Sequence, residues 1–212
     1  MTPRNAMVLA AGLGKRMRAA GGNLPKPLVR VADKPLIDYT LDHLAAAAVR
    51  RLVVNTHYLG DLLAAHLEDY AARHPEITLR LSPEETLLAT GGGVARALPH
   101  LGGQPFFVLN SDTILRDGAA PALARLAAAW NEARMDALLL LCPPDRAVGH
   151  TRGVDFTVGE DGRPVRAAGA ADPHIFCGVQ VLHPPLFDGS PSGAYSLNRH
   201  SDEAAAVRRL FP

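Results

Sequence analysis

Residues 6–17 of the 212-residue chain have the sequence AMVLAAGLGKRM, and this stretch predicts how the fold begins. Ala6–Ala10 is a short apolar run, which is long enough for a strand and too short for a helix. A glycine-rich loop, Gly12–Gly22, follows directly. A buried strand that ends in such a loop is typical of an α/β sheet, in which ligands bind beyond the carboxyl ends of the strands.

Helical and strand patterns alternate after this loop. Helices are expected over Pro35–Ala48, Asp61–Ala72, Val94–Leu98 and Pro121–Glu132, and strands over Leu52–Val54, Ile77–Leu81, Phe106–Leu109 and Ala137–Leu141. The strand patterns are continuously apolar rather than alternating, which indicates a sheet covered on both faces. The alternation therefore predicts a doubly wound, mostly parallel α/β sheet.

Prolines and glycines divide the chain after Cys142 into short segments, which predicts a small antiparallel subregion. A strand over Ile175–Leu182 and a helical stretch over Ser196–Arg209 are expected there. Neither a repeat nor a linker separates the parts. We therefore expect residues 1–212 to form a single domain with two halves, 1–142 and 143–212.

Composition argues against several classes of protein. The formal net charge is +1, so no electrostatic footprint indicates a nucleic acid or a membrane surface as partner. No apolar run approaches the length of a membrane span, and Met1–Asn5 does not resemble a signal peptide, so a cytoplasmic protein is expected. The two cysteines, Cys142 and Cys177, are expected to be free thiols, and the histidines lack the spacing of a metal site.

The first loop has the composition of a phosphate site. Its glycines let backbone N–H groups approach phosphate oxygens, while Lys15, Arg16 and Lys26 supply cations. A dinucleotide fingerprint would need a third small residue after Gly12 and Gly14, and a P-loop would need a hydroxyl residue where Arg16 stands. A glycine-rich turn with solvated cations remains the alternative.

The complete motif resembles the signature of the sugar-phosphate nucleotidyltransferase family, G-x-G-x-R-M followed by P-K-P. The matching residues are Gly12, Gly14, Arg16, Met17, Pro25, Lys26 and Pro27. The resemblance implies that the loop, including Ala11 and Lys15, holds a nucleoside triphosphate. It also implies that Arg16 stabilises the transition state and that Lys26 contacts phosphate, which makes these two the expected catalytic residues.

Asp112 is the expected metal ligand. It follows the apolar run Phe106–Leu109, so it lies at the carboxyl end of a predicted strand, and Mg²⁺ prefers one or two carboxylates together with phosphate oxygens. A strand-end Asp also commonly forms a turn or caps a helix. The family resemblance implies a Mg²⁺ ligand at this position. Asn110 would either touch the nucleotide or hold the loop in place.

Thr90 is expected to cap a helix that opens with Gly91, Gly92 and Gly93. These glycines would let a base or ribose lie flat on the backbone, or would simply form a flexible loop. The stretch is similar to E-T-G-G-G in the branch that activates N-acetylmuramic acid 1-phosphate with UTP. The resemblance implies nucleotide binding at Gly91 and Gly92. Ala89 stands where that branch has Glu, whose role would be absent or taken by Glu84 or Glu85.

Likeness to the branch continues through the second half. Asp155 lies in a stretch similar to G-x-G-D-F, and Gly178 in one similar to F-x-G-I-x-V-L-H-P. The resemblance implies that both contact the sugar, while Gly178 alone would also suit a β-bulge. Family members continue into a W-x-D/H-V-G-T segment with a second metal ligand. This sequence does not contain it, so we expect a truncated sugar-binding half, 143–212.

The resemblance implies direct transfer of a nucleotidyl group from a nucleoside triphosphate to a sugar 1-phosphate, with Mg²⁺ as cofactor. UTP with an amino-sugar or muramic acid phosphate is the first expectation. GTP with mannose or heptose phosphate and CTP with phosphocholine are the alternatives. A nucleotide-binding regulatory module without catalysis is the alternative from a different class.

Overall fold

The computed structural model describes residues 2–15, 23–151, 153–166 and 172–212, so Arg16 and Met17 lie outside the described residues. The strands of the large sheet are β1 (Asn5–Leu9), β4 (Arg51–Thr56), β5 (Thr78–Pro83), β6 (Phe106–Asn110), β7 (Ala137–Cys142), β8 (Phe156–Val158), β9 (Pro164–Arg166), β10 (Pro173–Leu182) and β11 (Leu210–Phe211). The helices are α2 (Leu36–Ala46), α3 (Gly60–Arg73), α4 (Ala89–Leu101), α5 (Ala122–Ala129) and α6 (Asn198–Ala206). Short 3-10 turns, η1 (Lys26–Leu28), η2 (Pro144–Arg146) and η3 (Pro184–Phe187), and a hairpin of β2 (Arg30–Val31) and β3 (Lys34–Pro35) complete the structure.

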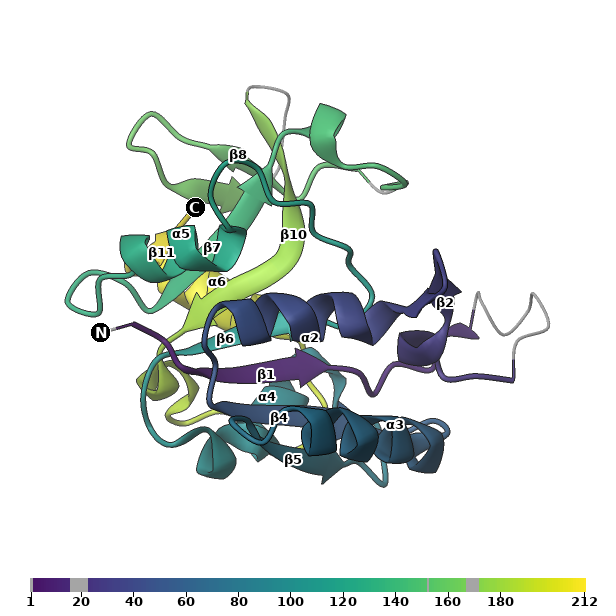
Figure 1. Ribbon diagram of the computed structural model, residues 1–212. Helices are drawn as coiled ribbons and strands as arrows, with labels where there is room; N and C mark the ends of the chain where they lie inside the picture. The colour runs from purple at the N-terminus through teal and green to yellow at the C-terminus, as the bar shows by residue number, and fades with distance from the viewer. Residues whose placement is uncertain (1, 16–22, 152, 167–171) are drawn as a thin grey trace.

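The large sheet has a parallel part and an antiparallel part. Strands β5, β4, β1 and β6 lie side by side in that order, and all three of their pairings are parallel. Strand β10 then pairs antiparallel with both β6 and β7, and the hairpin of β8 and β9 joins its first residues (Figure 1). The predicted α/β sheet with an antiparallel subregion is therefore confirmed.

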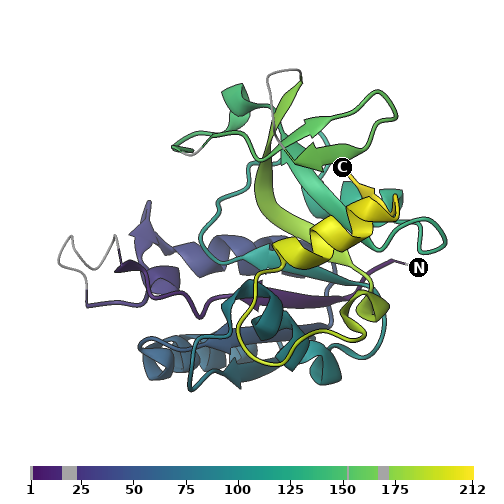
Figure 2. The ribbon, with the colours of Figure 1, turned by 180° about the vertical axis from the view of Figure 1, so that it is seen from behind.

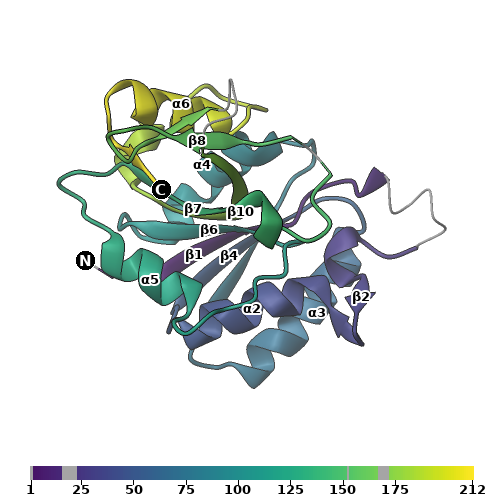
Figure 3. The same ribbon diagram turned by 90° about the horizontal axis from the view of Figure 1, so that it is seen from above.

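Helices cover both faces of the sheet, as the continuously apolar strands require. One core lies between the sheet and α2, α3 and α5, and a second lies between the sheet and α4 and α6 (Figure 3). Neighbouring residues of β1 serve both cores, because Val8 is buried in the first and Met7 in the second. In the described part of the chain, no helix is long and apolar enough to cross a membrane.

Several predicted boundaries differ from the structure. Helix α5 ends at Ala129 rather than Glu132, because Trp130 has extended backbone angles. The last helix ends at Ala206, and the chain then adds β11 parallel to β7, which the sequence pattern did not predict. The hairpin of β2 and β3 was also not predicted. Its turn residues Ala32 and Asp33 both have positive φ, a conformation that glycine or asparagine usually signals.

Candidate active site

The strand order predicts a ligand crevice between β1 and β6. From β1 the chain moves outward to β4 and β5, and it then returns across the other face of the sheet to β6. Connections on opposite faces leave an opening at the carboxyl ends of the two central strands, where ligands bind in open α/β sheets. Leu9 pairs with Asn110 at these ends, and Ser111 N donates to Leu9 O over 3.2 Å. The glycine-rich loop and the Asp112 turn therefore start side by side.

Lys26 and Asp112 meet at this crevice. The Lys26 ammonium group forms an ion pair with Asp112 Oδ2, although the two residues are 86 positions apart. Lys26 opens the 3-10 turn η1, in which Leu28 N donates to Pro25 O over 2.9 Å. The structure thus brings together two of the three side chains on which the predicted chemistry depends. The third, Arg16, is outside the described residues.

Gly14 of the glycine-rich loop lies beside Lys26. Gly14 has a φ of +57°, and a Cβ at that position would lie 3.2 Å from Lys26 Cβ. A Cβ on Gly12 would meet no described atom within 4 Å. Ala11 is buried and Lys15 is exposed. The loop therefore borders the Lys26–Asp112 pair, and their contact with a nucleotide stays a prediction.

Gly178 brings the second half of the chain to the same place. The pairing of β10 with β7 shifts in register between Phe176 and Gln180, so Gly178 lies in a bulge, with a φ of +70°. A Cβ at Gly178 would lie 2.7 Å from Asn110 Nδ2 and 3.0 Å from Thr113 Oγ1. The alternative of a β-bulge thus describes the backbone here, and the bulge borders Asn110 at the end of β6.

Asp155, the residue before β8, supports β10. Its Oδ2 accepts from Phe176 N over 3.0 Å, and its own N–H donates to His174 O over 3.1 Å. Both bonds fasten the start of β8 to β10, two residues before the bulge. A direct contact between Asp155 and the sugar stays a prediction.

The glycines at the start of α4 lie beneath another part of the chain. Gly91 N donates to Tyr195 O over 2.8 Å, and a Cβ on Gly92 would lie 2.2 Å from Gly193 O. Thr90 is not the N-cap, since α4 begins at Ala89 and Thr90 Oγ1 accepts from Leu197 N over 2.9 Å. Figure 2 shows α6 and the segment before it on the face that α4 covers. Close packing against residues 193–197 therefore accounts for small residues here.

Asn55 and Glu84 lie at the ends of β4 and β5, where the motifs did not assign Asn55 and named Glu84 only as an alternative. Both are buried, with exposed fractions of 3% and 4%. Asn55 is joined to Ala10 and to Glu84 by hydrogen bonds of 2.7 Å each. The sequence carried one signal for Asn55, which is an Asn at the end of an apolar strand pattern, as at Asn110. Glu84 faces inward, toward Asn55 and Leu88, and whether it takes the role of the Glu that Ala89 replaces stays a prediction.

The two cysteines are free thiols in adjacent strands, β7 and β10. Burial raises the pKa of Cys177 to about 12, with further contributions from the neighbouring Cys142 and the carboxylate of Asp155. Cys177 therefore stays protonated at neutral pH, and it is a weak nucleophile there.

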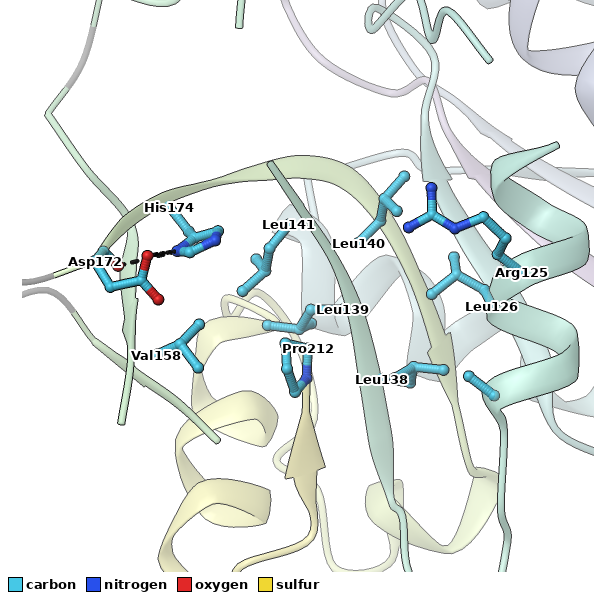
Figure 4. A pocket seen from close by; sticks show the side chains of 11 residues that line it. Arg125, Leu126, Leu138, Leu139, Leu140, Leu141, Val158, Asp172, His174 and Pro212 are labelled. Carbon is cyan, nitrogen blue, oxygen red and sulfur yellow. Dashed lines mark hydrogen bonds and ion pairs between the residues drawn. The ribbon is translucent and has the colours of Figure 1, made fainter. Parts of the chain in front are cut away.

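A pocket of about 400 Å³ lies elsewhere, along β7. Figure 4 shows its leucine floor, with Arg125 at one side and Asp172 and His174 at the other. Its lining includes neither Lys26 nor Asp112. The chemistry of the crevice, rather than the shape of this pocket, therefore identifies the candidate active site.

Known proteins are similar to this chain in sequence and in fold. The family described as the MobA-like NTP transferase domain matches residues 6–211. The N-acetylmuramate alpha-1-phosphate uridylyltransferase of Caulobacter vibrioides is 42% identical over 197 residues, covering 92% of this chain and 81% of that protein. Its counterpart in Neisseria meningitidis serogroup B is 37% identical over 190 residues, covering 89% of this chain and 79% of that protein.

Among solved structures, the inositol-1-phosphate CTP transferase from T. maritima has a TM-score of 0.79 at 18% identity, over 100% of this chain and 86% of that one. At this identity the match shows the fold. The family match spans the crevice and both halves of the chain, and the relatives match at 37–42% identity. The chain therefore belongs to the MobA-like NTP transferase family and is a nucleotidyltransferase.

Proposed function

We propose that the chain joins UTP to N-acetylmuramate 1-phosphate, forming the UDP-sugar and releasing pyrophosphate. The observation that carries the proposal is the ion pair of Lys26 and Asp112 beside the glycine-rich loop, at the switch point of the sheet. The names of the two bacterial relatives supply the choice of base and sugar. Residues 1–142 would bind the nucleotide, and 143–212 would bind the sugar.

The proposed reaction is a direct displacement. An oxygen of the sugar phosphate attacks the α-phosphorus of UTP, while the bond from that phosphorus to the bridging oxygen breaks and pyrophosphate leaves. Negative charge builds on the leaving pyrophosphate, so the reaction needs cations fixed in advance. Lys26 and Arg16 would supply them, and the backbone of the loop over Ala11–Gly14 would orient the phosphates.

Asp112 suits a Mg²⁺ site, because its carboxylate stands at the carboxyl end of β6 and already faces a cation, the Lys26 ammonium group. Bound Mg²⁺ would neutralise phosphate charge there as a Lewis acid. The side chains of the pair are 31% and 32% exposed, and ion pairs this exposed contribute only about 0.2–1 kcal/mol. Lys26 can therefore leave Asp112 and move to a phosphate at little energetic cost.

A pyrophosphate-release assay with UTP, GTP and CTP against a panel of sugar 1-phosphates tests the proposal. UTP with N-acetylmuramate 1-phosphate should give the highest kcat/KM. The variants Arg16→Ala, Lys26→Ala and Asp112→Asn should each lose on the order of 10²–10³ in kcat, as when a charge-stabilising donor is removed.

Lys34→Ala is the matched control, because Lys34 forms an ion pair with Asp42 on α2. This variant should leave kcat unchanged. A preference for GTP with mannose or heptose 1-phosphate would contradict the choice of substrates and support a guanylyltransferase. Thermal stabilisation by nucleotide without product from any pair would contradict catalysis and support a regulatory module.

A further inference from the structure

A chain of three hydrogen bonds, two buried and one part-buried, connects the start of the glycine-rich loop to the start of α4. Asn55 Oδ1 accepts from Ala10 N over 2.7 Å, and Asn55 Nδ2 donates to Glu84 Oε1 over 2.7 Å. The second oxygen of Glu84 accepts from Leu88 N over 2.9 Å. The donors fix the orientation of the amide, because Ala10 offers only an N–H and Glu84 offers acceptor oxygens.

The surroundings of the pair keep this geometry in place. Glu84 N donates to Thr56 O over 2.8 Å, so Glu84 is held against the end of β4. A Cβ on Gly93 would lie 2.9 Å from Asn55 Nδ2 and 2.9 Å from Glu84 Oε1. Glycine at this position of α4 therefore leaves room for the pair. When one partner is removed from such a set of linked hydrogen bonds, another buried group is left unsatisfied. The arrangement is therefore sensitive to single substitutions.

We propose that Asn55 and Glu84 are positioning residues for nucleotidyl transfer, which fix the loop after β1 relative to the turn that precedes α4. Ala10 is the last residue before the loop of the proposed phosphate site. Leu88 directly precedes the segment expected to approach the base. The inference rests on the proposed function, since these two segments would hold the two ends of one nucleotide.

Exchanging the amide and the carboxylate tests the pair. In Asn55→Asp, two carboxylates face each other, and in Glu84→Gln, an amide N–H faces either Asn55 Nδ2 or Leu88 N. The double variant Asn55→Asp/Glu84→Gln restores every bond. The new carboxylate accepts from Ala10 N and from the new amide, whose oxygen accepts from Leu88 N. The net charge of the pair is also restored.

Each single variant should lose roughly 10- to 100-fold in kcat/KM for UTP, the effect of one unsatisfied buried group. The double variant should recover to within about 3-fold of the parent, on the same reasoning. Assays run below the melting temperature of every variant separate this loss from unfolding. KM for the sugar phosphate should stay at the parent value, because the hydrogen bonds of the pair join residues of the first half, 1–142.

Asn5→Asp is the matched control. Asn5 begins β1, the strand that leads to Ala10, and it donates to Leu101 O over 2.7 Å at the opposite end of the sheet. It should lower the melting temperature and leave the kinetics unchanged. Parent-like kcat/KM in folded single variants, or a double variant no better than the worse single one, would overturn the positioning role.

The proposed function and the positioning role can fail separately. If the parent releases no pyrophosphate, the proposed function is wrong. Titration calorimetry with UTP on the parent, the two single variants and the double variant then tests the positioning role of the pair. Weaker UTP binding in the single variants with recovery in the double variant supports the pair. Equal affinity in all four, or no UTP binding by the parent, rejects it.

Discussion

At the scale of single residues, the backbone conformation of Gly178 constrains the proposed site. Its φ of +70° disfavours any other residue by about 1–2 kcal/mol. Its missing side chain also leaves space for Asn110 and Thr113. Gly178 thus sets how closely β10 approaches the end of β6, and with it the distance between the two halves of the proposed site.

Replacing Gly178 by Ala should therefore affect both stability and catalysis. The added Cβ would lie 2.7 Å from Asn110 Nδ2, so β10 or Asn110 must move. We expect the free energy of unfolding to fall by about 2–3 kcal/mol, from the left-handed backbone and the clash together. Displacing the sugar side should lower kcat/KM for the sugar phosphate on the order of 10- to 100-fold. Urea unfolding and the pyrophosphate assay measure the two effects.

Gly162→Ala separates the two contributions. Gly162 has a similar φ of +74°, but a Cβ there would meet no described atom within 4 Å. This control should lose about 1 kcal/mol of stability through the backbone alone and keep its kinetics. Equal kinetic losses in both variants would contradict a specific role of Gly178 beside Asn110.

At the scale of elements, the start of α4 is built to receive the segment before α6. Gly92→Ala would place a Cβ 2.2 Å from Gly193 O, which is backbone and cannot turn away as a flexible side chain could. Glycine to alanine inside a helix normally stabilises by about 0.5–1 kcal/mol. Here we expect the opposite sign, a loss of about 1–3 kcal/mol in urea unfolding, with faster amide exchange over 193–197.

Gly118→Ala is the control, since a Cβ there would meet no described atom within 4 Å, and its effect should stay within about 0.5 kcal/mol. Unchanged stability of Gly92→Ala with a raised KM for UTP would show that the nucleotide, rather than the segment 193–197, requires this glycine. The same pair of variants therefore tests the prediction that Gly92 binds nucleotide.

Local patterns and distant contacts explain what the sequence could predict of these elements. The continuously apolar runs of β1, β4 and β6 predicted their place to within one or two residues, because burial on both faces leaves a local signature. The insertion of β10 between β6 and β7 has no such signature, because strand order is set by pairing between distant segments. The covering of Gly91 and Gly92 by residues 193–197 is equally nonlocal.

The candidate site divides in the same way. The motifs predicted Lys26 and Asp112 as partners in one site, and their ion pair agrees with that placement. Asn55 and Glu84 could not be paired from the sequence, since their contact depends on the register of β4 and β5 and on the space that Gly93 leaves. Hydrogen bonds across strand ends follow from the fold and have no motif of their own.

At the scale of the whole molecule, a buried tyrosine and a half-buried cysteine tie stability to pH. Burial, with the nearby carboxylates of Asp42 and Glu76, raises the pKa of Tyr70 from 10.0 to about 12. Burial likewise raises the pKa of Cys177 from 9.0 to about 12. Tyr70 is a core residue of α3, and Cys177 lies in the bulged strand β10, so both halves of the chain carry one such group.

Alkaline pH should therefore destabilise the folded protein. A raised pKa means that the folded state holds the proton more tightly than the unfolded state, so each contribution is complete below pH 9 and is lost as pH rises toward 12. Urea unfolding between pH 8 and pH 11 should show a steeper fall in the parent than in Tyr70→Phe/Cys177→Ser. Tyr39→Phe, which removes a hydroxyl that donates to Val31 O, is the matched control and should keep the parent's slope. If the stability of the double variant fell as steeply as that of the parent, groups other than Tyr70 and Cys177 would control stability at alkaline pH.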